Sequence, residues 1–320
     1  MFKLPILILT YNRPEHLLKL IKKLKKIKPS KIYISCDGPK NNYDREKILK
    51  ISRIINLIDT KTKVISNFLK KNKGIRLAPQ CGISWFFKKE KMGIILEDDC
   101  IPTIFFFQYM KYLLSKYKNN RKIFAISGYN HLGKTNFGEA SYFLSNYFLC
   151  WGWATWRRSW IAASKNLTSY LREKNFRSLK NKFENDIEFT YWKKTITNVY
   201  EGKTKTWDIQ FMASMWKKNS FCLLPNVNMV NNIGFDDSST TSPSLRFQVA
   251  KAFNWNGKIK DPKLLRLDKE NELMIFNNLF RPKFFLYPFR IIFLLKIIFS
   301  QPKFFFRKTI LQIRENFIRI

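Results

Sequence analysis

Three consecutive acidic residues, Glu97, Asp98 and Asp99, directly follow the short apolar run at residues 94–96. A short, continuous apolar run is typical of a buried strand in a mostly parallel sheet, and such sheets bind ligands beyond the carboxyl ends of their strands. Adjacent carboxylates repel one another unless positive charge lies nearby, and hard oxygen ligands suit Mg²⁺ or Mn²⁺. The pattern therefore indicates a cation site that bridges carboxylates to a diphosphate. The alternative is a strand that runs into a solvated acidic turn.

Two earlier strand-like segments, residues 6–9 and 32–35, also end in polar residues. Helical spacing of apolar residues at 14–27 and 44–57, with a third strand-like run at 63–66, predicts a βαβαβ opening with parallel strands. The polar strand ends would then lie beside the acidic triplet in one crevice. The polar residues are Thr10, Tyr11, Asn12 and Arg13 after the first segment, and Asp37 and Gly38 after the second.

This crevice would not hold phosphates through a known glycine-rich loop. The sequence contains neither the GxGxxG pattern of a dinucleotide fold nor the GxxxxGK[ST] pattern of a P-loop. A diphosphate would therefore have to be held by the metal ion and by basic side chains. Beyond Cys100, we expect a Phe-rich helix at 105–117, strands at 123–127 and 142–149, and a charged helical stretch at 171–200.

Four tryptophans fall within ten residues of the segment WGWATWRRSW, residues 151–160. Trp faces stack against the apolar face of a pyranose, so Trp151 and Trp153 are candidates for a sugar platform. A packed aromatic core segment explains the pattern equally well. Asp208 follows Trp207 and opens a predicted helix. In the first turn its carboxylate would complement the helix dipole by about 0.3–1 kcal/mol, a purely structural alternative to chemistry.

The chain has 59 Lys and Arg against 23 Asp and Glu, a formal net charge of +36. Such charge favours nucleic acid or an anionic membrane as partner. A lysine excess accompanied by abundant Phe, Ile and Asn is also typical of an AT-rich genome. Five widely spaced cysteines without a CxxC, and two histidines, argue against a zinc site or disulfide framework and fit a reducing compartment. The strand-like PILIL near the start predicts no signal peptide.

The tail, residues 279–320, is rich in Phe, Ile, Lys and Arg. Pro288, Arg290 and Lys296 interrupt its apolar run short of the about 20 residues that a membrane span needs. The composition favours basic amphipathic helices that lie on a membrane surface. The alternative is a C-terminal helix that packs on the domain.

In order and spacing, these motifs resemble nucleotide-sugar-dependent glycosyltransferases of the GT-A fold. The opening PILILTYNRPEHL is similar to family-2-like members, and ILEDDCIPTIFFFQYM resembles N-acetylglucosaminyltransferase I and its relatives, which carry an EDD form of the DxD motif. YISCDG, WGW and TWDIQFMASMW resemble that family's second strand, acceptor loop and catalytic-base segment, and CLLP and NNIGF take the place of its closing segment. The resemblance covers about residues 4–240. It implies an α/β GT-A fold, Rossmann-like, with helices on both faces of a mostly parallel sheet.

The resemblance also implies a role for each matched residue. Asp99 would bind the Mn²⁺ or Mg²⁺ ion directly, and Asp208 would be the catalytic base. Glu97 and Asp98 would contact the ribose and nucleotide, and Asp37 would meet the base. Thr10, Tyr11, Asn12 and Arg13 would lie along the nucleotide, and Trp151 and Trp153 would face the acceptor.

The implied reaction transfers a sugar from a nucleoside-diphosphate sugar, UDP-linked by expectation, to a hydroxyl of a glycan or glycolipid, with inversion, in bacterial surface polysaccharide or lipopolysaccharide synthesis. We expect residues 1–100 to bind the nucleotide-sugar and residues 101–241 to bind the acceptor. Residues 242–320, which have no counterpart in the family, would form a helical extension on an anionic membrane. That places the protein on the cytoplasmic face of a bacterial cell membrane.

Two other functions compete. A sugar-nucleotide pyrophosphorylase has a related fold but would normally carry a Gly-rich, Arg-containing loop after the first strand, where this chain has LTYNRPEHL. A non-enzymatic nucleic-acid-binding protein would explain the net charge but not three acids at a strand end, so nucleic acid is the disfavoured partner.

Overall fold

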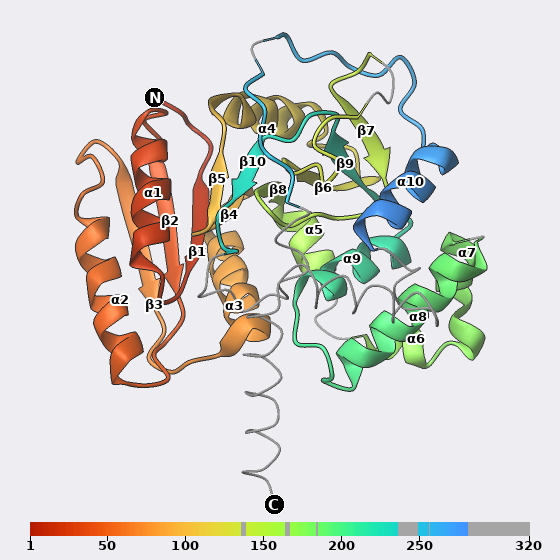
Figure 1. Ribbon diagram of the computed structural model, residues 1–320, viewed down its shortest axis with the longest axis horizontal. Helices are drawn as coiled ribbons and strands as arrows, with labels where there is room; N and C mark the ends of the chain where they lie inside the picture. The colour runs from red at the N-terminus through yellow and green to blue at the C-terminus, as the bar shows by residue number, and fades with distance from the viewer. Residues whose placement is uncertain (136–138, 164–166, 184, 236–248, 256, 281–320) are drawn as a thin grey trace, which may run out of the picture.

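The structure, a computed structural model, describes residues 1–135, 139–163, 167–183, 185–235, 249–255 and 257–280. Its strands are β1 Ile6–Thr10, β2 Lys31–Cys36, β3 Lys63–Phe68, β4 Met92–Glu97, β5 Cys100–Pro102, β6 Ile123–Ser127, β7 Tyr142–Ser145, β8 Trp153–Trp156, β9 Phe221–Pro225 and β10 Val230–Asn232. An eight-stranded sheet runs in the order β3-β2-β1-β4-β8-β6-β9-β7, and β5 pairs with β10 in a separate ribbon (Figure 1).

Parallel pairing joins β3, β2, β1 and β4, and also β6 and β9. β8 is antiparallel to both its neighbours, β4 and β6, and β7 is antiparallel to β9. The predicted α/β architecture with a mostly parallel sheet is therefore confirmed. β8, however, lies in the tryptophan-rich segment, for which the sequence had suggested no strand.

Helices cover both faces of the sheet, as predicted. They are α1 Pro14–Lys25, α2 Asn42–Ile55, α3 Gly74–Lys89, α4 Ile104–Lys116, α5 Arg157–Ala162, α6 Thr168–Leu171, α7 Arg177–Lys182, α8 Asp186–Tyr200, α9 Asp208–Lys217 and α10 Lys269–Leu279, with a 3₁₀ turn, η1, at Lys174–Phe176. Successive residues of a strand point to opposite faces. Ile6 and Ile8 of β1 accordingly pack with α1, α2 and α4, whereas Leu7 and Leu9 pack with α3 and α9.

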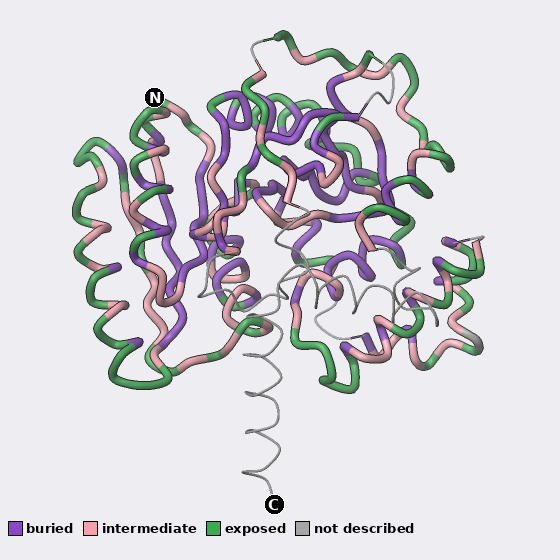
Figure 2. Tube along the Cα trace, in the orientation of Figure 1, coloured by how far each residue is buried: buried purple, intermediate pink, exposed green. Residues whose placement is uncertain are grey.

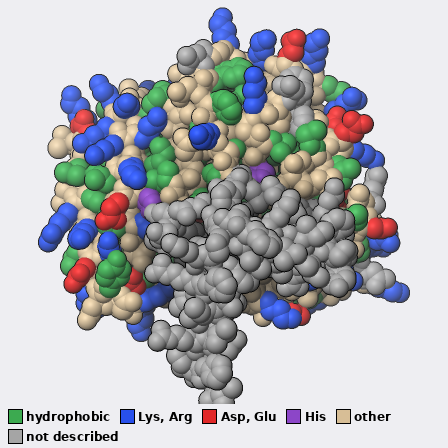
Figure 3. All heavy atoms as spheres, in the orientation of Figure 1, with side chains coloured by type: hydrophobic (Ala, Val, Ile, Leu, Met, Phe, Trp, Pro, Cys, Tyr) green, Lys and Arg blue, Asp and Glu red, His purple; other side chains and the backbone are tan. Residues whose placement is uncertain are grey.

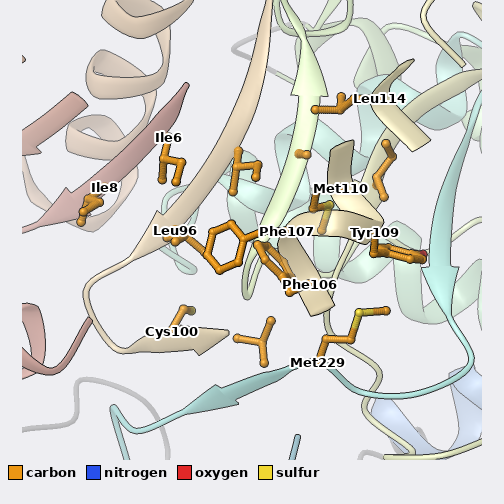
Figure 4. Close-up of a cluster of buried hydrophobic side chains, with 14 of the residues drawn as sticks. Ile6, Ile8, Leu96, Cys100, Phe106, Phe107, Tyr109, Met110, Leu114 and Met229 are labelled. Carbon is orange, nitrogen blue, oxygen red and sulfur yellow. The ribbon is translucent and has the colours of Figure 1, made fainter. Parts of the chain in front are cut away.

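The sheet is the buried centre of a three-layer arrangement, and the outer faces of α1 and α2 are exposed (Figure 2). The core on the α4 side is strongly aromatic. Phe106, Phe107 and Met110 of α4 gather beside Leu96 of β4, close to Met229 in the segment before β10 (Figure 4). This packing fixes the end of β4, where the acidic triplet stands.

Two predicted elements differ from the structure. The strand predicted at 142–149 ends at Ser145, because the Asn146 amide donates to Glu272 of α10 rather than to a neighbouring strand. The helical stretch predicted at 171–200 is divided into η1, α7 and α8. Phe176 has a left-handed φ of 52°, a conformation that a continuous α-helix does not contain.

The described residues after 248 pack against the domain. Asp261 accepts hydrogen bonds from Tyr112 and Lys116 of α4 and from Tyr142 of β7, and α10 buries Ile275 and Phe276. The predicted boundary at 241, and residues 242–248, 256 and 281–320 of the predicted extension 242–320, lie outside the described ranges, and its attachment to a membrane stays a prediction. Every helix within those ranges is too short or too polar to span a bilayer.

Candidate functional site

The carboxyl ends of β1, β2 and β4 lie side by side. Thr10 is in register with Cys36, and Leu9 is in register with Glu97. The polar residues that follow these strands therefore surround one edge of the sheet, as the sequence predicted. Register in a parallel sheet holds these residues in place, because a shift by one residue would turn every strand side chain to the other face.

Asp98 is fastened to the end of β1. Its Oδ2 accepts a 2.6 Å hydrogen bond from the Thr10 hydroxyl and a longer one, 3.4 Å, from the Tyr11 amide. Burial, reinforced by the charge of Asp99, raises the pKa of Asp98 to about 7. Asp98 and Thr10 are both buried, so their first effect is to hold the acidic turn against the β1–α1 loop.

Asp99 forms an ion pair with Arg13, with 3.2 Å between Oδ2 and Nη1. The segment after β10 crosses this pair: the Ile233 amide donates to the Asp99 carbonyl at 2.9 Å. A Cβ atom on Gly234 would overlap the Asp99 carboxylate and lie 3.1 Å from Arg13 Nη1. Any side chain at position 234 would therefore displace the Asp99 carboxylate from its place beside Arg13.

Asp208 is the first residue of α9. Its Oδ1 accepts hydrogen bonds from the Thr206 hydroxyl and the Ile209 amide, and its Oδ2 lies 4.0 Å from the Cys150 thiol. Burial raises the pKa of Glu97 well above its ordinary value, and the charges of Asp99, Asp98 and Asp208 add to the rise. The last contribution shows that Asp208, from the second half of the chain, lies within electrostatic reach of the acidic triplet.

Two thiols, Cys100 and Cys150, border this acidic region. Burial raises the pKa of each well above its ordinary value. The carboxylates of Asp99 and Glu97 add to the rise for Cys100, and Asp208 and Glu97 do so for Cys150. Both thiols are therefore protonated at neutral pH, which argues against a thiolate nucleophile here.

The donor set fits a hard divalent cation. The charges of Asp99, Asp98 and Asp208 all act on Glu97, and carboxylate oxygens are the ligands that Mg²⁺ and Mn²⁺ prefer. Within the described ranges, no three His, Cys, Asp or Glu side chains converge as a complete ligand group. Mg²⁺ is commonly bound by one or two carboxylates together with substrate phosphates. Asp99 with Asp98 or Glu97 fits such a shared site.

Asp37, the predicted base contact, holds the loop before α3. Its Oδ1 accepts from the amides of Gly38 and Lys73, and its Oδ2 accepts from the Asn72 side chain and the Gly74 amide, all within 3.0 Å. A carboxylate offers about four lone-pair positions. All four are used, so contact with a nucleotide base would require one of these bonds to be given up. The predicted contact itself stays a prediction.

Asp44 belongs to the same region and was not identified from the sequence. It is buried, and its carboxylate accepts hydrogen bonds from Tyr11 and Asn12, two of the predicted nucleotide residues. A local signal existed, because Asn41 and Asp44 have the N-x-x-D spacing of a helix N-terminus. The partnership with Tyr11, 33 residues earlier, is tertiary and leaves no mark in the sequence.

The two residues predicted to face the acceptor, Trp151 and Trp153, lie in different environments. Trp153 is 1% exposed, and its ring packs against Phe148, Trp207 and Phe211 at centroid distances of 4.8–5.6 Å. The prediction that Trp153 faces an acceptor is therefore wrong. As a β8 residue on the α9 side of the sheet, it forms the core, which was the alternative interpretation.

Trp151 remains at the site. It is partly buried, between Tyr129 at 4.6 Å and Phe235 at 5.4 Å, so it lies under the segment that also crosses Asp99. Gly152 allows this placement because it adopts a left-handed φ of 69° and a Cβ atom there would meet Val230 at 2.8 Å. Its role toward an acceptor stays a prediction.

Positive charge is widely spread on one face of the molecule. On the face shown in Figure 3, the Lys and Arg side chains of the described residues are spread around the molecule and do not form one continuous patch. A broad spread is what a general lysine excess produces, whereas a nucleic-acid groove gathers its basic residues along one stripe.

Comparison with known proteins gives weak similarities. No protein-family profile and no curated protein matches the chain. Two structures of UDP-glucose pyrophosphorylase, one with UDP-glucose and one without ligand, are 10% and 11% identical, with TM-scores of 0.36 and 0.38. Each alignment covers 72% of this chain and 93% of the other.

A putative glucose-1-phosphate thymidylyltransferase from Bacillus anthracis, in complex with a sucrose, is 11% identical with a TM-score of 0.27. That alignment covers 68% of this chain and 94% of the other. Similarities at this level carry no argument about activity. The fold assignment rests on the strand order and on the two helical layers described above.

Proposed function

We propose that the chain is a metal-dependent glycosyltransferase that moves a sugar from a nucleoside-diphosphate sugar, UDP-linked by preference, to a hydroxyl of a glycan or glycolipid. The proposal rests mainly on the proximity of Asp208, from the second half of the chain, to Glu97 of the acidic triplet. One side of such a site can hold a diphosphate, and the other can hold a base near the acceptor. The motif order that resembles GT-A glycosyltransferases supports the same proposal.

Asp208 would accept the proton of the acceptor hydroxyl. Hydrogen bonds from Thr206 and Ile209 orient its Oδ1, while Oδ2 faces the side of Cys150. A positioned general base typically contributes about 10²–10⁴ in rate. Attack from the acceptor side, opposite the diphosphate, would invert the anomeric centre.

Arg13 and the strand ends would act on the donor. Arg13 is held beside Asp99 and is close enough to the triplet to meet the charge that develops on a departing diphosphate. Asp99, with Asp98 or Glu97, would hold Mn²⁺ or Mg²⁺, and the bound ion would supply positive charge to that diphosphate. Thr10, Tyr11 and Asn12 would line the nucleotide, and the Gly234 segment would shield the site from water.

Two reactions distinguish the proposal from a pyrophosphorylase. With Mn²⁺ and a panel of nucleotide-sugars, the proposed enzyme releases nucleoside diphosphate and labels an acceptor, and it makes no pyrophosphate from UTP and a sugar 1-phosphate. Asp208→Asn keeps the side-chain volume and should lower transfer by about 10²–10⁴ without changing UDP affinity. Pyrophosphate formation, or full transfer by Asp208→Asn, would contradict the proposal.

The acceptor and location belong to the same proposal. We propose a lipid-linked or lipopolysaccharide acceptor and attachment of the protein to the cytoplasmic face of a bacterial cell membrane through its basic tail. The support is compositional: Lys and Arg alternate with Phe and Ile between residues 281 and 320. Each basic residue near an anionic surface contributes about 1 kcal/mol.

A further inference from the structure

Asp44 is the centre of a hydrogen-bond cluster between two loops at the nucleotide side of the site. It is 4% exposed, in the first turn of α2, and its amide donates to the Asn41 side chain at 2.8 Å. Its Oδ2 accepts from the Tyr11 hydroxyl at 2.5 Å and from the Lys40 amide at 3.0 Å, and its Oδ1 accepts from the Asn12 amide nitrogen at 2.8 Å.

These bonds favour the ionised carboxylate. Burial alone would raise the pKa of Asp44, but the hydrogen bonds from Tyr11, Asn12 and Lys40, together with the Lys40 charge, lower it below its ordinary value. Hydrogen bonds to an ionised acceptor are shorter and stronger than neutral ones. The cluster is therefore a firm attachment and not an incidental surface contact.

The two tethered side chains belong to the β1–α1 loop. Tyr11 and Asn12 are only partly buried, and the Lys40 amine lies 5.9 Å from the centre of the Tyr11 ring. A partly exposed side chain without an attachment samples several rotamers and loses that freedom when a ligand binds. Asp44 removes this cost in advance, because it fixes both side chains through their polar tips.

We propose that Asp44 is a positioning residue that pre-orders Tyr11 and Asn12 for the nucleotide; the inference rests on the proposed nucleotide site. Asp44 acts through Tyr11 and Asn12 and does not itself contact the ligand. Its effect therefore falls on nucleotide affinity and on the donor KM, and leaves the acceptor KM unchanged.

A double-mutant cycle on UDP affinity tests the proposal. Isothermal titration with UDP and Mn²⁺ compares the full chain with Asp44→Asn, Tyr11→Phe and the double variant. Each single variant should weaken binding by about 10-fold, the value expected when an ordered side chain is released. The double variant should be no weaker than Asp44→Asn, because both changes break the same tether.

Asn41→Ala is the matched control. It removes the cap of α2, destabilises the same helix end and leaves Tyr11 with an intact acceptor. UDP affinity within about twofold of the wild type is expected, together with a lower melting temperature. Equal weakening by Asn41→Ala and Asp44→Asn would overturn the inference, since fraying of α2 would then explain both.

Wild-type affinity in Tyr11→Phe, which changes one hydroxyl on a partly exposed ring, overturns the inference even where Asp44→Asn fails to fold. Effects that multiply in the double variant overturn it as well. If the wild-type chain binds no UDP, both this inference and the proposed function are overturned. If it binds UDP and the affinity is unchanged in Asp44→Asn and Tyr11→Phe, the inference alone is overturned.

Discussion

Replacement of Glu272 by glutamine should make the protein more stable at alkaline pH. Glu272 lies on α10 and is 5% exposed. Its pKa is raised to about 8, chiefly by burial and further by the charge of Glu188. Hydrogen bonds from Ser145 and the Asn146 amide, and the charge of Lys182, act in the opposite direction. Its Oε1 has no hydrogen-bond partner among the described residues, so the neutral acid is the better fit for this position.

The sign and size of the effect follow from proton linkage. Between its ordinary pKa of 4.5 and about 8, Glu272 is protonated in the folded state and ionised in the unfolded chain. The folded state therefore binds more protons, and the free energy of unfolding falls as pH rises. Each pKa unit corresponds to about 1.4 kcal/mol, so the loss between pH 5 and pH 8 is at most about 4 kcal/mol.

Lys182 titrates in a different window. Burial lowers its pKa from 10.5 to about 8, so its contribution changes above pH 8 and in the opposite direction. Asp98 and Glu97, whose pKa values burial also raises, contribute to the wild-type profile between pH 5 and pH 8, so the difference between the wild type and Glu272→Gln isolates Glu272. Urea denaturation followed by tryptophan fluorescence should show a fall in stability with pH that is smaller in Glu272→Gln than in the wild type.

Glu270→Gln is the matched control on the same helix, because Glu270 is exposed. It should keep the wild-type pH profile. Parallel profiles for the wild type and Glu272→Gln would mean that Glu272 is solvated and that α10 is not packed against Asn146.

Three further perturbations test the site. Trp153→Ala should lower the free energy of unfolding by about 3–5 kcal/mol, as measured by urea denaturation, because it leaves a cavity in the core. Trp151→Ala should lower that free energy less and should raise the acceptor KM. Equal destabilisation by both variants would contradict the assignment of Trp153 to the core and Trp151 to the site. Asp37→Asn should lower stability by about 1–3 kcal/mol, since its amide nitrogen would face two N–H donors; an unchanged melting temperature would mean that the four bonds matter little. The full chain should sediment with anionic liposomes at low salt and be released at high salt, and failure to sediment would contradict the membrane proposal.

The sequence predicted the edge of the sheet where the site lies because local features determine it. Short apolar runs end in polar residues at Thr10, Asp37 and Glu97, and Pro14 starts a helix directly after the first of them. Parallel pairing then aligns the strand ends without further information. The placement of Asp208 at a helix start was equally local, because Trp207 and Asp208 precede a run with helical spacing.

What could not be predicted depends on long-range pairing. Trp153 enters the core because β8 is inserted antiparallel between β4 and β6, and alternating tryptophans look the same on a core strand and on a sugar platform. Asp37 accepts its hydrogen bonds from a loop about 35 residues later in the chain. Asp44 accepts one from Tyr11, 33 residues earlier. Carboxylates used as internal acceptors and carboxylates used for ligands have identical sequence signatures.

The shared metal–diphosphate site is tested most directly by titration calorimetry with UDP in the presence and absence of Mn²⁺. We expect Mn²⁺ to strengthen UDP binding in the wild type and EDTA to abolish this gain. Asp99→Asn should remove the gain, while the melting temperature of the free protein stays near that of the wild type. UDP affinity that is the same with Mn²⁺, with EDTA and in Asp99→Asn would contradict a shared metal–diphosphate site at the end of β4.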